Sequence, residues 1–206
     1  DQRFQPLEKK SNGEGNDDTW LRDRVKELGG KVGKFGNQVG GYGGLISTLQ
    51  NRRAGLSSTH GRSIPLLIKI APDLDERSRS HIASVALARN LDGLLISNTT
   101  TMRPSHLTSR AQNEPGGLSG RPLFSRSTSL LADMYRRLQG SIPLIGIGGI
   151  SSGDDAYMKI RAGASLVQLY TALTYKGPGL ISQIKTELAA RIVTDGFDNI
   201  SSVVGV

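Results

Sequence analysis

Short apolar runs alternate with amphipathic stretches along most of this chain. Runs of strand length occupy residues 66–70, 93–97, 143–147 and 165–169. Apolar residues recur at helical spacing over about 75–89, 125–138, 154–161 and 178–193. Four repeated strand–helix units predict an α/β fold whose parallel sheet has right-handed crossovers. Near-continuous apolar strands fit a sheet covered on both faces or closed as a barrel, and four units make half of an eight-unit barrel.

The first 44 residues lack this regularity. Residues 9–18 are polar and turn-prone, which predicts disorder, and a short helix is expected over about 19–28. Residues 29–44 include eight glycines, which fit either a nucleotide-contacting loop or a disordered linker. The linker is favoured because no strand precedes the glycines. A short helix beginning near Leu45 and a loop over 51–63 complete the region.

Composition narrows the classes of function. The 206 residues suffice for one domain or for part of a larger one. Without cysteine, and with three histidines lacking ligand spacing, no metal site is expected. The net charge of +8 is scattered, and the chain has few aromatic residues for base stacking, so nucleic acid is not an expected partner. No apolar run reaches the length of a membrane span. The first residue is Asp and no signal peptide is visible, so we expect a processed or excised piece.

The segment from Pro143 to Gly153 contains the strongest chemical signal. An apolar strand enters the turn Gly146-Ile-Gly-Gly-Ile-Ser-Ser-Gly153, and Asp154 then opens a helix. Glycines let the backbone approach a ligand, and backbone N–H groups can bind a phosphate without a basic side chain. Near the last two strands of a barrel, this layout predicts a phosphate-binding corner.

Polar residues in or after the other strands add weaker signals. Lys69 lies within an apolar strand, where it is either a cation beside a bound cofactor or a lysine that reaches solvent from the strand end. Residues 98–100, Asn-Thr-Thr, follow a strand and fit either a ligand site or an ordinary cap. Residues 116–120 and the pair Tyr170-Thr171 fit either ligand contacts or turns.

The order of these motifs resembles dihydroorotate dehydrogenase, in its class 2, quinone-linked form. The resemblance covers essentially all of residues 65–206, with a weaker match possible over 44–64, while residues 1–43 show no convincing match. The matching segments are Leu67-Ile-Lys-Ile-Ala-Pro-Asp-Leu74, Asp92-Gly-Leu-Leu-Ile-Ser-Asn-Thr-Thr100, Gly116-Gly-Leu-Ser-Gly-Arg-Pro-Leu123, Ile145-Gly-Ile-Gly-Gly-Ile-Ser-Ser-Gly153 and Ile160-Arg-Ala-Gly-Ala-Ser-Leu-Val-Gln-Leu-Tyr-Thr-Ala-Leu-Thr174.

The resemblance implies a TIM-type (β/α)8 barrel, of which residues 44–206 form the C-terminal half, and FMN as cofactor. It implies FMN contacts from Lys69, Thr99, Ser119, Gly120, Gly148, Gly149, Leu169, Tyr170 and Thr171. It assigns the substrate ring to Asn98, with Thr99 beside it, and the quinone site to Tyr170, Thr174 and Pro178.

The implied reaction is oxidation of (S)-dihydroorotate to orotate in pyrimidine biosynthesis, with ubiquinone as the final acceptor. The implied location is the mitochondrial inner membrane, through a membrane-associating region that this sequence does not show. The family's catalytic base is a serine in an Asn- and Pro-rich segment, and the run Ser57-Ser-Thr59 does not match it.

Two other functions remain open. One is an inactive chain that retains at most nucleotide binding or association with a partner half, because a half-barrel exposes two sheet edges. The other is a different FMN- or phosphate-binding barrel enzyme, which would explain the glycine corner but not the combined order of Lys69, Asn98 and Tyr170.

Overall fold

The computed structural model describes residues 41–105 and 107–206. Residues 43–206 form one compact unit. The polar segment 9–18, the expected helix at 19–28 and all but the last four residues of the glycine-rich stretch lie outside the described residues. The boundary at residue 43 or 44 therefore stays a prediction from sequence.

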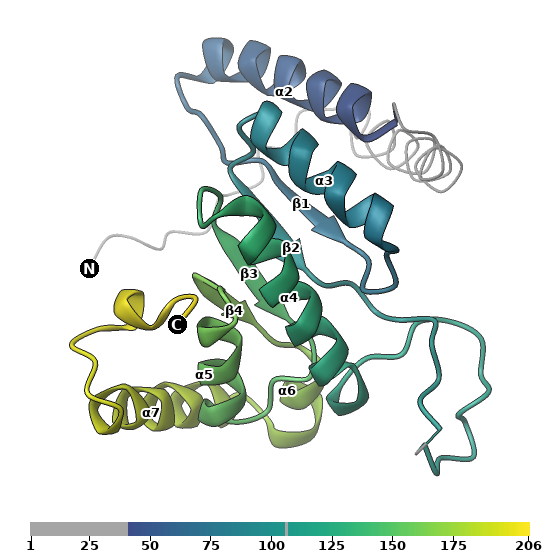
Figure 1. The fold of residues 1–206 in the computed structure, drawn as a ribbon, viewed down its shortest axis with the longest axis vertical. Coiled ribbons are helices and arrows are strands. Elements are labelled where there is room, and N and C mark those ends of the chain that lie inside the picture. Colours follow the sequence, from purple (N-terminus) through teal and green to yellow (C-terminus); the bar gives the residue numbers. More distant parts are fainter. Residues whose placement is uncertain (1–40, 106) are drawn as a thin grey trace, which may run out of the picture. The chain divides into compact units, whose positions relative to one another are not determined.

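Strands and helices alternate along the described chain (Figure 1). The strands are β1 (Leu67–Ile70), β2 (Gly93–Ile96), β3 (Leu144–Ile147) and β4 (Leu166–Gln168). The longer helices are α2 (Gly41–His60), α3 (Glu76–Ala88), α4 (Phe124–Leu138), α5 (Gly153–Arg161) and α7 (Gly179–Thr194). Shorter elements are the 3-10 helix η1 (Arg121–Leu123), the helix α6 (Thr171–Lys176) and the 3-10 helix η2 (Ile200–Val203).

The four strands form one parallel sheet in the order β1-β2-β3-β4. Each strand lies beside its neighbour in sequence, and a helix follows each one. This arrangement confirms the predicted repeat and is half of a TIM-type barrel. In the described part of the chain, β1 and β4 are the edge strands.

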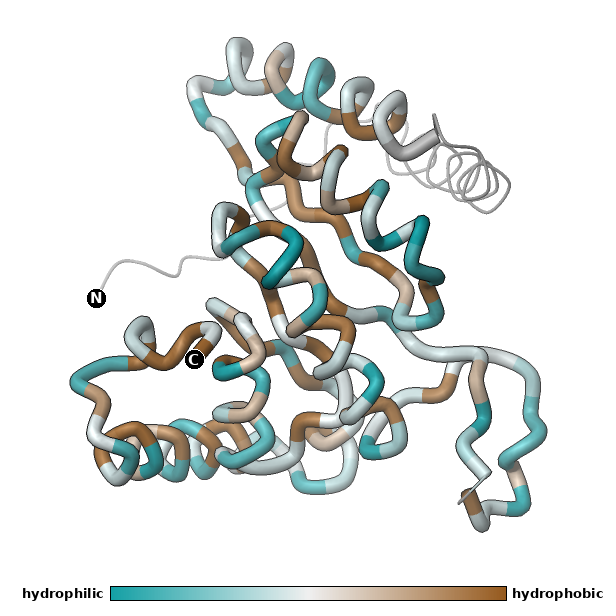
Figure 2. Tube along the Cα trace, in the orientation of Figure 1, coloured by the Kyte–Doolittle hydropathy of each residue, from teal (hydrophilic) through white to brown (hydrophobic). Residues whose placement is uncertain are grey.

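One side of the sheet is closed by α3, α4 and α5, which lie in front of it in Figure 1. Residues that pair across parallel strands point to the same side, so Ile70 and Ile96 share this face. Ile96 is completely buried there, as is Leu131 of α4. Apolar strands and apolar stripes on the covering helices are visible in Figure 2. Burial of these side chains supplies most of the driving force for the fold.

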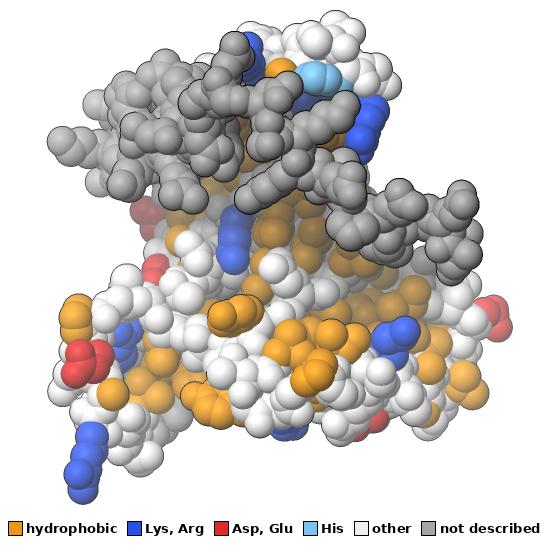
Figure 3. Space-filling model, turned by 180° about the vertical axis from the view of Figure 1, so that it is seen from behind, with side chains coloured by type: hydrophobic (Ala, Val, Ile, Leu, Met, Phe, Trp, Pro, Cys, Tyr) orange, Lys and Arg blue, Asp and Glu red, His pale blue; other side chains and the backbone are white. Residues whose placement is uncertain are grey.

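The other side of the sheet carries the alternate residues. Lys69 pairs with Leu95, Leu95 with Ile145, and Ile145 with Leu166, so these four form one row across the sheet. Lys69 is exposed, Leu95 and Ile145 are half-buried, and Leu166 is 64% exposed. From behind, hydrophobic side chains gather over the sheet (Figure 3). In a closed barrel this row would face the interior.

Two sequence predictions near the N-terminal side are wrong. Residues 41–44 belong to α2 rather than to a linker, and α2 continues to His60 where a loop was expected over 51–63. Helix propensity there is low, and the hydroxyls of Ser58 and Thr59 bond to carbonyls four residues earlier, which does not strengthen a helix. Arg53 of this helix pairs with Asp92, far away in the sequence. This tertiary contact favours the helix against the local propensity, and sequence periodicity does not reveal it.

The other predicted elements are confirmed with boundary shifts of one or two residues. Sequence reasoning missed the 3-10 helices η1 and η2 and the six-residue helix α6. Helix α6 ends in the exposed residues Tyr175 and Lys176 and is too short for a helical pattern to appear. It turns the chain immediately after β4, and this places Thr171 beside the cavity described next.

Candidate functional site

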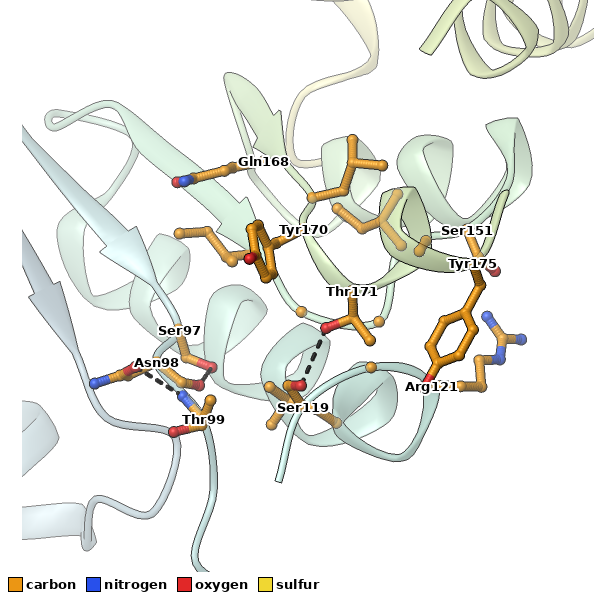
Figure 4. Close-up of a pocket in the computed structure, with 18 of the residues that line it drawn as sticks. Ser97, Asn98, Thr99, Ser119, Arg121, Ser151, Gln168, Tyr170, Thr171 and Tyr175 are labelled. Carbon is orange, nitrogen blue, oxygen red and sulfur yellow. Dashed lines mark hydrogen bonds between the residues drawn. The ribbon is translucent and has the colours of Figure 1, made fainter. Parts of the chain in front are cut away.

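A cavity of about 600 Å³ opens at the carboxyl ends of the strands (Figure 4). It is lined by every residue assigned to FMN or to the substrate ring from sequence. These residues are Lys69, Asn98, Thr99, Ser119, Gly120, Gly148, Gly149, Leu169, Tyr170 and Thr171. They come from all four strands or the segments after them, where barrel enzymes build their sites.

The glycine corner forms one wall of this cavity. Gly148 and Gly149 follow β3 with φ angles of 105° and 74°, a region that side chains disfavour. A Cβ atom on Gly149 would lie 2.5 Å from the Cβ of Phe124, so the corner also lacks space for one. Among the described residues, none accepts a hydrogen bond from the backbone N–H of Gly148 or Gly149. Two adjacent unpaired donors beside a cavity suit an anion such as a phosphate.

Two backbone N–H groups in the first turn of α5 donate to side chains of this protein. The Ser152 hydroxyl accepts a hydrogen bond from the N–H of Asp155 at 3.1 Å, and the Glu187 carboxylate accepts one from Gly153 at 2.6 Å. The N–H groups of Gly148 and Gly149, which have no acceptor among the described residues, lie before this helix.

Asp155 holds the segment between the glycines and α5. Its buried carboxylate accepts hydrogen bonds from the N–H and the hydroxyl of Ser151, at 2.9 and 3.0 Å, and pairs with Arg121. Burial alone would raise the pKa of Asp155, but the hydrogen bonds from Arg121 and Ser151 outweigh it and keep the pKa below its ordinary value. Asp155 is therefore ionised at neutral pH and rigidly positioned.

Asn98 and Thr99 lie where β2 ends. The side-chain oxygen of Asn98 accepts a hydrogen bond from the N–H of Thr99 at 2.9 Å, which fixes the amide plane beside the cavity. Thr99 packs directly against Gly117, where a side chain would clash with it. Thr100, the last residue of the Asn-Thr-Thr motif, is buried and donates to Asp73 at 2.6 Å. For this residue the alternative of an ordinary cap at the strand end fits better than a ligand contact.

The wall opposite Asn98 joins two segments far apart in sequence. The Thr171 hydroxyl donates to that of Ser119 at 3.0 Å (Figure 4). Gly120 beside it has a φ of 77°, and a Cβ atom there would lie 3.1 Å from the Thr171 side chain. The glycine thus allows the loop after β2 to approach the start of α6, which closes this side of the cavity.

For Lys69 the sequence left two interpretations open, a cation beside a cofactor and a lysine that reaches solvent. Its side chain is exposed on the open side of the sheet, although it borders the cavity. No ion pair to it is found in the described part of the chain. Its ammonium is therefore available to a ligand.

The residues assigned to a quinone are not all gathered at this cavity. Tyr170 lines it and is 81% exposed, whereas Thr174 and Pro178 do not line it. Sequence reasoning missed ten lining residues. Six are polar, namely Ser97, Arg121, Ser151, Gln168, Tyr175 and Lys176, and four are apolar, namely Leu123, Ile147, Ile150 and Ala172. Arg121 and Ser151 lie inside motifs that were recognised, so adjacency to the glycines was the available signal.

Two further observations concern the described residues as a whole. They contain no cluster of three or more His, Asp or Glu side chains able to hold a metal ion. None of their helices is both long and apolar enough to cross a membrane.

Comparison with known sequences identifies relatives of one kind. The family model for dihydroorotate dehydrogenase matches residues 26–192. The dihydroorotate dehydrogenase (quinone) of Parvibaculum lavamentivorans is 55% identical over 157 residues, which are 76% of this chain and 45% of that protein. The mitochondrial dihydroorotate dehydrogenase (quinone) of Arabidopsis thaliana is 58% identical over 68% of this chain and 31% of its own length. The chain thus spans less than half the length of these relatives.

Solved structures agree with the sequence relatives. DHODH from Eimeria tenella in complex with ferulenol matches with a TM-score of 0.78 and 38% identity, over 84% of this chain and 49% of that one. The ligand-free form from the same organism matches with a TM-score of 0.67 and 46% identity, over 68% and 39% of the two chains. Sequence and fold agree, and the chain belongs to the dihydroorotate dehydrogenase family, in its quinone-linked class.

Proposed function

We propose that this chain supplies the FMN-binding half of the active site of a quinone-linked dihydroorotate dehydrogenase. The observation that carries the proposal is the single cavity that unites Lys69, Asn98, the Gly148–Gly149 corner and Thr171. These groups come from four successive strand–helix units, and a phosphate site alone would not require the lysine and the asparagine.

The residues present fit FMN. The unpaired N–H groups of Gly148 and Gly149 would bind the phosphate, and the linked hydroxyls of Ser119 and Thr171 would contact its polar chain. The exposed ammonium of Lys69 would lie beside the flavin ring system. FMN, when bound, supplies the redox chemistry of the reaction, while the protein orients the reactants and excludes water.

Asn98 would orient the ring of dihydroorotate. Because its side-chain oxygen is held by the N–H of Thr99, its NH₂ group is the part left to donate to a substrate carbonyl or carboxylate. A serine base, as the family uses, would have to come from residues beyond the motifs found in these 206 residues. Tyr170, Thr174 and Pro178 would border the quinone that accepts the electrons.

The location and partners follow from the same proposal. Some relatives are named mitochondrial, as in Mus musculus, and bacterial relatives are not. We place this protein at the mitochondrial inner membrane with dihydroorotate, orotate and ubiquinone as its small-molecule partners, and with no nucleic acid.

A second candidate function is cofactor binding without turnover. The four-stranded sheet with β1 and β4 at its edges and the exposed Leu166 favour it, because an open half-barrel leaves its interior row uncovered. A different barrel flavoenzyme is not favoured, since the relatives share the dihydroorotate dehydrogenase name.

Flavin binding and flavin reduction separate these functions. The purified 206-residue chain is mixed with FMN, and binding is followed by quenching of flavin fluorescence; dihydroorotate is then added without oxygen. Binding followed by bleaching at 450 nm would support the dehydrogenase. Binding without bleaching would support the second candidate, and absence of binding would refute both.

A further inference from the structure

Lys159 is a completely buried lysine on α5, directly behind the glycine corner. Its ammonium lies 2.6 Å from the hydroxyl oxygen of Ser127 and 3.4 Å from the carbonyl oxygen of Ile147. The Ser127 hydroxyl lies 3.1 Å from the carbonyl oxygen of Phe124 and 3.3 Å from that of Gly148, so its one proton is shared between these two acceptors. The lysine therefore reaches the carbonyls of two successive peptide units, one directly and one through a serine.

These two peptide units carry the free donors of the cavity. The bonds Ile147–Gly148 and Gly148–Gly149 are trans, so each N–H points away from the carbonyl of the same unit. Carbonyls drawn toward Lys159 consequently turn the N–H groups of Gly148 and Gly149 the other way. Ile147, Gly148 and Gly149 all line the cavity, and we infer that these N–H groups face it.

Burying the Lys159 ammonium at this place costs desolvation free energy that its neutral surroundings do not fully offset. Burial lowers the pKa of Lys159 to about 7, although the carboxylate of Asp155 acts in the opposite direction. Asp155, on the same helix, is paired with Arg121. The contacts from α4 and β3 are neutral, namely Ser127, the ring of Phe124 at 5.1 Å and the Ile147 carbonyl. An apolar residue of similar length would avoid the desolvation cost.

We propose that Lys159 is a positioning residue for the phosphate of FMN: its buried ammonium orients and polarises the Gly148 and Gly149 N–H groups from behind the corner. The proposal rests on the proposed function, because it concerns the same cavity. It predicts that the lysine discriminates between flavins with and without a phosphate group, since it acts on the phosphate corner alone.

The first test compares FMN with riboflavin, which has the same ring but no phosphate. Dissociation constants for both are measured at pH 7 for the full chain, for Lys159→Met and for Lys185→Met. Lys185 is an exposed lysine of α7 and serves as the matched control. We expect Lys159→Met to weaken FMN binding about tenfold, the loss of one charge-assisted interaction, and to leave riboflavin binding within about twofold. Lys185→Met should change neither.

A second test uses the unsubstituted chain and inorganic phosphate. The titration of lysine side chains carrying ¹³C at Cε is followed by NMR, and the Lys159 signal is assigned by its through-space contact with the ring of Phe124. Phosphate bound at the corner favours the charged lysine and should raise this midpoint by about one pH unit. The measurement does not depend on the folding of any variant.

The outcomes separate the two proposals. Equal losses of FMN and riboflavin in Lys159→Met, or no loss of either, would overturn the positioning role and leave the flavin site intact. If the unsubstituted chain binds neither flavin, or if Lys159→Met does not fold, the phosphate titration decides. A raised midpoint supports the lysine's role at an anion corner, and an unchanged midpoint overturns it.

Discussion

Gly149 and Phe124 are in such close contact that the corner of the cavity admits only glycine. A Cβ atom at Gly149 would lie 2.5 Å from the Cβ and 2.9 Å from the backbone nitrogen of Phe124. Because Phe124 is buried at the start of α4, it has no room to move away. The first turn of α4 thus fixes the backbone path of the segment that offers the free donors.

Replacing Gly149 by alanine should therefore destabilise the fold and abolish flavin binding. Gly177 provides a matched control, because its φ is also 74° but no atom lies within 4 Å of a Cβ there. We expect Gly177→Ala to cost about 1–2 kcal/mol of unfolding free energy from backbone strain alone, and Gly149→Ala about 1–3 kcal/mol more from overpacking. Urea unfolding measures both. Equal costs would show that the contact with Phe124 relaxes without penalty.

Asp155 should matter through its charge as well as its hydrogen bonds. Asp155→Asn keeps the size but loses the pairing with Arg121 and weakens the bonds from Ser151. We expect a loss of about 2 kcal/mol at pH 7, typical of a hydrogen-bonded buried carboxylate. The control is Asp154→Asn, because Asp154 is exposed and its ion pair with Arg191 is long, at 3.9 Å.

The pH dependence of this effect has a defined sign. The pKa of Asp155 is lower in the folded chain than its ordinary value of 3.8, so the unfolded chain takes up the proton first as pH falls. Its stabilisation is therefore complete above about pH 5 and declines as pH falls through 3.8 toward the folded pKa. The difference in unfolding free energy between the unsubstituted chain and Asp155→Asn should shrink below pH 4. A constant difference down to pH 3 would contradict the role of its charge.

The α/β fold and much of the cavity could be predicted because their signals are local. The four strands are short apolar runs in the sequence, and the glycines of the corner indicate a backbone conformation with positive φ that other residues disfavour. The polar residues after β2 follow from strand position. The strands, the glycine turn and the polar strand ends need only neighbouring residues, whereas the individual contacts of Ser119, Gly120, Leu169 and Thr171 were assigned from the resemblance to the family.

The features that were missed depend on contacts between distant segments. The continuation of α2 to His60 relies on Arg53 and Asp92, 39 residues apart. Lys159 reads as an ordinary charged position of an amphipathic helix, and only the fold brings it to Ser127, 32 residues earlier. For Lys69 the sequence left open whether the side chain contacts a cofactor or reaches solvent, because the sequence does not say which side of the sheet is covered.

The anchoring of α2 is itself testable. The Asp92 carboxylate accepts a hydrogen bond from the N–H of Leu66 at 2.7 Å and pairs with Arg53. Removing the pair by Arg53→Gln should speed amide hydrogen exchange in the second half of α2, where local propensity is low. Arg52→Gln is the matched control, since Arg52 is its exposed neighbour on the same helix. Similar exchange in both variants would show that α2 holds without this anchor.

Lys69 provides the last prediction, which depends on the proposed FMN site. Its exposed ammonium borders the cavity and lies in one row with Leu95 and Ile145, so a flavin ring above this row would contact it. Lys69→Met preserves length and apolar contact but removes the charge. It should lower affinity for FMN and for riboflavin alike, by about tenfold, because the ring is common to both. Lys159→Met, in contrast, is expected to weaken the binding of FMN but not that of riboflavin. Lys185→Met again controls for a lost surface charge, and unchanged binding of both flavins by Lys69→Met would remove Lys69 from the flavin site.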